Sequence, residues 1–167
     1  MLFETVKRLD LWLNFELASG HCDIPCKIYD PSTAQIATLS LIRMVDLLLE
    51  LEGKAPYTLS QQATIARLTA EKEAQGIKLK EEIRIICSDY VKQPQLDAFP
   101  NLHELTHNIM LKASYNKQHV DRPAALELLK LVNEFAEIFW QSKNIATYTA
   151  TCPYLPSESV VYPDLKG

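Results

Sequence analysis

A short segment near the N-terminus, HCDIPCKIYDP at residues 21–31, concentrates side chains that can bind a metal ion. His21, Cys22 and Cys26 supply an imidazole and two thiols, and such ligands suit late first-row transition metals. Pro25 lacks an N–H and disfavours helical geometry at the residue before it, so the segment must turn back on itself. We call residues 21–29 the hook.

Two common cysteine chemistries do not fit the hook. A structural zinc site usually combines a CxxC pair with a second CxxC or HxxxH pair. His103 and His107 have HxxxH spacing, but the sequence contains no CxxC pair to complete such a site. A thioredoxin-like redox site needs CxxC, whereas three residues separate Cys22 from Cys26. The alternative, a coincidental polar turn with two ordinary thiols, explains neither the crowding of ligands nor the prolines.

The composition limits the class of protein. A chain of 167 residues with 47% hydrophobic and 23% charged residues is typical of one globular domain. The net charge of −4, without a run of Lys and Arg, argues against a nucleic-acid partner. No apolar segment approaches the ~20 residues of a membrane span, so we expect no membrane partner. The glycine-rich motifs that bind phosphates are also absent from the sequence.

Residues 1–20 have two interpretations. Polar residues interrupt the apolar run that a secretory signal requires, and Leu2, Val6, Leu9 and Leu13 recur at helical spacing instead. The segment is therefore either an extra amphipathic helix or a leader that ends at Gly20. With neither a secretory signal nor a disulfide framework, we expect a cytoplasmic protein.

The rest of the chain predicts an all-α fold, an antiparallel four-helix bundle over residues 21–146 that carries the hook at its N-terminus. The expected helices begin near Pro31, Ser60, Pro100 and Asp121 and end near Gly53, Tyr90, Tyr115 and Phe139. Gly76 should loosen the second helix locally. Residues 147–167 are rich in proline and lack helical spacing, so they predict a tail that is draped over the surface or disordered.

The hook resembles the nickel hook of the nickel-dependent superoxide dismutases, whose pattern is His-Cys-Asp-x-Pro-Cys-x-x-Tyr-Asp-Pro. The resemblance continues with CSDY at 87–90, FPNLHEL at 99–105 and IFWQSK at 138–143. It covers about residues 21–143. It implies the same fold that the helical spacing predicts, a four-helix bundle.

The resemblance also implies an activity, a cofactor and partners. A maturation protease would remove the leader, and nickel would then bind the free amine and imidazole of His21, the amide of Cys22 and the thiolates of Cys22 and Cys26. Nickel would alternate between Ni(II) and Ni(III) while superoxide is converted to dioxygen and hydrogen peroxide. Subunits of this family form a homohexamer, so we expect the same assembly here.

Three further residues receive roles from the resemblance. Tyr29 would limit access to the metal to small anions, Tyr90 would support Tyr29 through its hydroxyl group, and Asp23 would shape the hook. For the two tyrosines the alternative is an ordinary half-buried aromatic residue. The remaining histidines, at 103, 107 and 119, match no ligand of the family.

The sequence departs from the family pattern at three positions. Lys27 replaces a glycine after the second hook cysteine, where it would either attract superoxide or obstruct the hook. Ala37 and Gln75 replace a glutamate and an arginine that hold the hook histidine, and loss of such partners commonly costs ~10–100-fold in activity. The alternative function is a non-catalytic nickel- or copper-binding protein, or a precursor whose hook is inert.

Overall fold

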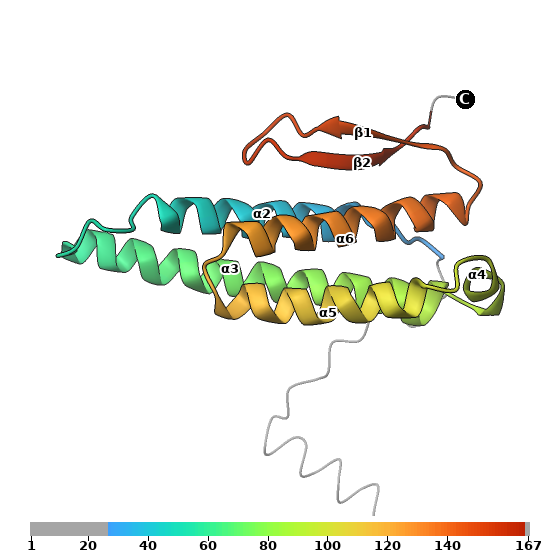
Figure 1. Ribbon diagram of the computed structural model, residues 1–167, viewed down its shortest axis with the longest axis horizontal. Helices are drawn as coiled ribbons and strands as arrows, with labels where there is room; N and C mark the ends of the chain where they lie inside the picture. The colour runs from blue at the N-terminus through green and yellow to red at the C-terminus, as the bar shows by residue number, and fades with distance from the viewer. Residues whose placement is uncertain (1–26, 166–167) are drawn as a thin grey trace, which may run out of the picture.

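The computed structural model describes residues 27–165 and confirms the predicted helical bundle (Figure 1). The long helices pack as two layers, α2 with α6 above α3 with α5 (Figure 1). The helical segments are α2 (Ser32–Leu49), α3 (Leu59–Ile85), the π-helical η1 (Ile86–Tyr90), α4 (Gln93–Ala98), α5 (Leu102–Gln118) and α6 (Arg122–Gln141). Two strands follow, β1 (Thr147–Thr151) and β2 (Ser159–Pro163). The core between the layers contains Leu41, Ile42, Val45, Leu79, Ile83, Ile109, Leu128, Val132 and Phe135.

Local hydrogen bonds explain where the helices begin. Asp121 is the N-cap of α6, as the sequence predicted, and accepts a bond from the Ala124 N–H at 3.0 Å. For α2 the N-cap is Pro31, and the Asp30 carboxylate just before it accepts a bond from the Ser32 N–H at 2.8 Å. The prediction was wrong for α3. Its N-cap is Thr58, which forms a capping box with Gln61, and not Ser60.

The segment between α3 and α5 is more helical than predicted. The last turn of the predicted second helix is a π-helix, η1, which ends at Tyr90. The stretch expected only to break the chain contains the short helix α4, with Pro94 in its first turn. Proline is tolerated there because the N–H groups of a first helical turn have no partner within the helix.

Helix α2 corrects the expectation that no apolar segment approaches the length of a membrane span. Its length and composition alone would allow a membrane span. Core helices of helical bundles share this composition, and 44% of the helix is buried, with α3 and α6 as its neighbours. In this structure α2 is therefore a core helix of the bundle.

Gly76 lies where α3 passes close to α5. A Cβ atom at this position would lie 2.5 Å from the Cγ of Lys117 on α5. The glycine does not interrupt α3, which continues to Ile85. Gly76 therefore permits the close packing of the two helices.

Lys72, one helical turn before Gly76, is almost completely buried at 1% exposure. Its amine donates to the carbonyl oxygens of Asn116 at 2.5 Å, Lys117 at 2.6 Å and His119 at 2.9 Å. These carbonyls lie at the C-terminal end of α5, where helical carbonyls have no partner within the helix and favour a cation. Burial lowers the pKa of this amine, and the charge of Glu73 opposes that effect.

The C-terminal segment is ordered, which corrects the prediction that allowed disorder. Strands β1 and β2 form an antiparallel hairpin that pairs Tyr148 with Tyr162 and Ala150 with Val160. The hairpin lies along α2 and α6, with β2 on the side nearer the helices (Figure 1). It buries Cys152, Val160 and Val161, which joins the segment to the core of the bundle.

Polar side chains attach the hairpin to the helices. Arg122 on α6 donates to Asp46 of α2 at 2.7 Å and to Glu158 of the hairpin loop at 2.6 Å. The two carboxylates raise the pKa of the Arg122 guanidinium, mainly through these hydrogen bonds. Because one guanidinium on α6 contacts both α2 and the hairpin loop, we infer that it fixes the hairpin relative to α2 and α6.

Candidate metal centre

The described structure begins at Lys27, the residue that follows the last predicted metal ligand, Cys26. His21, Cys22, Cys26 and Asp23 lie outside the described residues, so their roles stay predictions. Among residues 27–165, no three His, Cys, Asp or Glu side chains are grouped so as to hold a metal ion. The structure describes the segment from Lys27 onward, which directly follows the predicted ligands, and the side chains that surround this segment.

Tyr29 and Tyr90, the two predicted site tyrosines that the structure describes, lie together although 61 residues separate them in the sequence. Their ring centroids are 5.9 Å apart with a tilt of 48°. The ring of Tyr90 also packs against Phe139 at 4.9 Å, again tilted. Tilted aromatic pairs at these distances are favourable. The contacts hold the end of the hook against η1 and α6.

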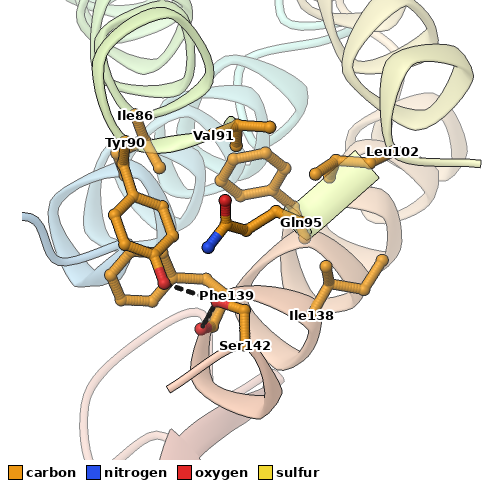
Figure 2. Close-up of a pocket in the computed structure, with 9 residues that line it drawn as sticks. Ile86, Tyr90, Val91, Gln95, Leu102, Ile138, Phe139 and Ser142 are labelled. Atoms are coloured by element: carbon orange, nitrogen blue, oxygen red, sulfur yellow. Dashed lines mark hydrogen bonds between the residues drawn. The ribbon is translucent and has the colours of Figure 1, made fainter. Parts of the chain in front are cut away.

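A short chain of hydrogen bonds fixes the hydroxyl group of Tyr90 (Figure 2). The oxygens of Tyr90 and Ser142 are 2.7 Å apart, and Ser142 donates to the carbonyl oxygen of Phe139 at 2.7 Å. Since the serine hydroxyl has one proton, the Tyr90 hydroxyl must be the donor to Ser142. The Tyr90 oxygen keeps its capacity to accept a hydrogen bond. Ser142, which the sequence analysis missed, therefore orients Tyr90.

The space beside Tyr90 is too small for a substrate site. It is a cavity of about 10 Å³, which is room for about one water molecule. Its walls are mostly apolar side chains (Figure 2), namely Ile86, Val91, Leu102, Phe135, Ile138 and Phe139. We infer that it is a gap in core packing.

Lys143 is a second residue near the site that the sequence analysis missed. Its amine lies 4.7 Å from the ring centroid of Tyr90 and 5.0 Å from that of Phe139. A cation over aromatic faces is held by the electrostatic field of the rings. The spacing from Phe139 to Lys143, i to i+4 at the end of a helix, was the available signal. A positive charge thus lies beside the tyrosine pair.

Lys27 adopts a backbone conformation that favours glycine. Its φ angle is +58°, in the left-handed region. A Cβ atom in this conformation costs roughly 1–2 kcal/mol. The conformation explains why a glycine is common at this position in the family pattern, and why lysine is unfavourable here.

We expect Lys27→Gly to stabilise the folded chain by about 1 kcal/mol, because it removes this unfavourable conformation. Thermal unfolding of protein that contains the hook measures the effect. Asn144→Gly is the matched control, since Asn144 has a φ angle of +59° and asparagine tolerates this region well. An equal or smaller gain from Lys27→Gly than from Asn144→Gly would contradict the explanation.

The structure describes Ala37 and Gln75, which stand where the family pattern has the glutamate and the arginine that hold the hook histidine. Ala37 is 1% exposed within the core cluster, and Gln75 donates to Glu71 of the same helix at 2.6 Å. Neither residue supplies the charge that the family pattern has at these positions. Of the other histidines, His119 stacks on Tyr115 with ring centroids 4.0 Å apart.

Comparison with known proteins decides the family. The model of the nickel-containing superoxide dismutases matches residues 16–143. The chain belongs to this family. A nickel superoxide dismutase of Streptomyces coelicolor is 28% identical over 125 residues, which cover 75% of this chain and 89% of that protein. One from Streptomyces seoulensis is 27% identical with the same coverage.

Solved structures agree with the fold. A native nickel superoxide dismutase structure superposes with a TM-score of 0.65 at 28% identity, over 74% of this chain and 99% of the other. Another, with the nickel ligation of the oxidised state, gives 0.63 at 29% identity with the same coverage. The family match ends at Lys143, so the hairpin lies outside it.

The donors of this chain fit the nickel cofactor of the family. His21, Cys22 and Cys26 offer an imidazole and two thiolates, and these nitrogen and sulfur donors would suit a late first-row metal such as nickel. The next residue of the chain, Lys27, begins the described segment that leads to the contact between Tyr29 and Tyr90. Tyr29 of this pair is therefore three positions after the last donor, Cys26.

Proposed function

We propose that this chain is a nickel superoxide dismutase that converts superoxide to dioxygen and hydrogen peroxide at the hook. The observation that carries the proposal is the family match over residues 16–143 together with the retained donors His21, Cys22 and Cys26. Bound nickel would supply the one-electron chemistry by cycling between Ni(II) and Ni(III).

The residues around the hook would control access and charge. Tyr29 would limit the approach to small anions, and Tyr90, fixed by Ser142, would keep Tyr29 in place through the ring contact. Asp23 would shape the turn of the hook. Lys143 would raise the local concentration of an anionic substrate, because a positive charge at the entrance increases association rates.

We expect Lys143→Gln to lower the rate constant for superoxide by about 2–10-fold at low ionic strength, and to make the rate less dependent on salt. Pulse radiolysis or stopped-flow measurement at several salt concentrations tests this. Lys130→Gln on α6 is the control, because 11 residues of helix place Lys130 about 16 Å from Gln141 at the end of α6, near Lys143. Equal salt dependence in both variants would contradict the role of Lys143.

Maturation and assembly belong to the same proposal. A protease would remove residues 1–20, which frees the amine of His21, and the mature protein would act in the cytoplasm. Several large apolar side chains are more than half exposed on the isolated subunit, namely Ile36, Ile77 and Leu111. Burial of such side chains between subunits is favourable, which supports an oligomer, and the family resemblance suggests that this oligomer is a homohexamer. Light scattering on nickel-loaded protein would test the assembly.

The choice between an enzyme and a passive metal-binding protein depends on the metal. Protein beginning at His21 would be loaded separately with nickel and with copper, and superoxide consumption would be measured beside metal content. We expect turnover only with nickel. Stoichiometric nickel without turnover would favour the alternative, a non-catalytic nickel- or copper-binding protein.

A further inference from the structure

The hairpin has two outer backbone edges. Side chains of the helices form hydrogen bonds to the edge of β2 but not to the edge of β1 among the described residues. On β2, the Val161 N–H donates to the Asn133 side chain at 3.2 Å, and the Val161 carbonyl accepts from Gln35 at 2.8 Å. Asn133 also donates to the carbonyl of Ser159 at 2.9 Å. The outer edge of β2 is therefore closed by side chains of α2 and α6.

The outer edge of β1 carries the backbone groups of Thr147, Thr149 and Thr151. Bonds from Cys152 to Glu158 at 3.0 Å and from Asp164 to Ala146 at 2.7 Å mark the two ends of the ladder. Since antiparallel bonding alternates along a strand, Tyr148 and Ala150 direct their backbone groups towards β2 and the three threonines direct theirs away. Within the described part of the chain, no hydrogen bond reaches these outward groups.

This edge lacks the features that normally protect an edge strand. Its sequence, TYTAT, contains no charge and no proline, and consists largely of residues that favour strands. Figure 1 shows β1 on the side of the hairpin away from the helices. An unprotected edge of this kind is a template for another strand.

We propose that β1 pairs with β1 of a second copy of this chain, antiparallel and centred on Thr149. In that register Thr149 faces Thr149 of the other copy and Thr147 faces Thr151. Every outward N–H then meets an outward carbonyl, because the same residues supply both sides. A strand of unrelated sequence would satisfy the backbone equally well but would not share the symmetry.

The side chains of this register are also complementary. Tyr148, which is 53% exposed, comes to lie opposite the small Ala150 of the other copy, so the large ring finds space. The threonines form cross-strand pairs, and no like charges meet because the strand has none. The second copy is therefore the partner whose chemistry fits this edge.

The proposed contact is independent of the nickel chemistry. It uses residues 147–151, whereas the family match ends at residue 143. Since Gln35 of α2 and Asn133 of α6 bond to the β2 edge of the hairpin, the two bundles would lie at opposite ends of a four-stranded sheet. The contact would therefore add to any assembly that the helices form.

Two measurements on the full chain test the pairing. Hydrogen exchange should show amides of Thr147, Thr149 and Thr151 that become protected by more than about tenfold as protein concentration rises. Thr149→Pro should abolish this protection at the other two amides, because proline removes the central outward N–H while edge strands tolerate it. Thr149→Val, which keeps the N–H, should retain the protection.

Cross-linking identifies the partner. In Thr149→Cys the paired Cα atoms would lie about 5.5 Å apart, within disulfide range, so mild oxidation with oxidised glutathione should join two copies through residue 149. Tyr148→Cys should not cross-link to itself, because the register places it opposite residue 150. Mass spectrometry of the linked peptides separates these bonds from those of native cysteines. Outward amides that exchange freely at every concentration, or a link through residue 148 and not 149, would overturn the proposal.

Discussion

Replacing Cys26 by serine should remove both nickel and activity from the mature protein. The hook offers few donors, and a serine hydroxyl is a far poorer ligand for nickel than a thiolate. Loss of a residue that merely holds a ligand costs about 10–100-fold, so loss of the ligand itself should exceed about 100-fold. Metal analysis and superoxide consumption, measured on protein that begins at His21, would show the effect.

Cys87→Ser is the matched control for this experiment. Cys87 is one of the two free cysteines among the described residues, and its sulfur lies 3.6 Å from the hydroxyl of Thr106. A serine keeps a hydrogen-bonding group at this position, so we expect nickel content and activity close to those of the parent protein. Full nickel content in Cys26→Ser would show that the metal is bound elsewhere.

Replacing Lys72 by methionine should strongly destabilise the bundle. Methionine is similar in length, but it leaves the carbonyls of Asn116, Lys117 and His119 without the donor that they share. Each polar group buried without a partner costs about 1–3 kcal/mol, and some of these carbonyls would recover water. We therefore expect a loss of about 3 kcal/mol, or about 6–12 °C in Tm for a chain of this size.

Lys80→Met separates this effect from the general loss of a lysine on α3. Lys80 donates to the hydroxyl of Ser114 on α5 at 2.9 Å, in a partly buried position that water can reach. We expect this change to cost less than about 1 kcal/mol. Equal losses in the two variants would show that the buried amine does not stabilise the end of α5.

The bundle was predictable because its signals are local. Asp121 followed by a proline two residues later marks the start of α6, and the structure has its N-cap at that aspartate. The starting residue of α3 was wrong because Thr58 and Ser60 are both good N-caps. Gln61, three residues after Thr58, completes a capping box, and this was the signal that should have decided between them.

The hairpin was missed because its pattern is unusual. In β2 two successive residues, Val160 and Val161, are buried, so the usual alternation of a strand with one solvent-exposed face is absent. Successive residues of a strand point to opposite faces, so both faces of β2 are covered where it packs against α2 and α6. The sequence of the strand does not encode this tertiary arrangement. The prolines beside the strands also favoured the prediction of a tail.

Some residues of the candidate site were likewise predicted from the sequence, and others were found only in the structure. The contact between Tyr29 and Tyr90 involves two residues that the family resemblance singled out. Ser142 and Lys143 reach Tyr90 only because the end of α6 lies beside η1, and the i to i+4 spacing of Phe139 and Lys143 does not specify this arrangement. The left-handed backbone of Lys27 could have been expected from the glycine in the family pattern.

The central claim is that the hook binds nickel through the free amine of His21 and turns over superoxide only after the leader is removed. The most direct measurement compares the chain beginning at Met1 with the chain beginning at His21, each incubated with nickel and assayed for bound metal and superoxide consumption. We expect stoichiometric nickel and rapid turnover in the trimmed chain alone. Equal nickel content and equal turnover in the untrimmed chain would contradict the claim.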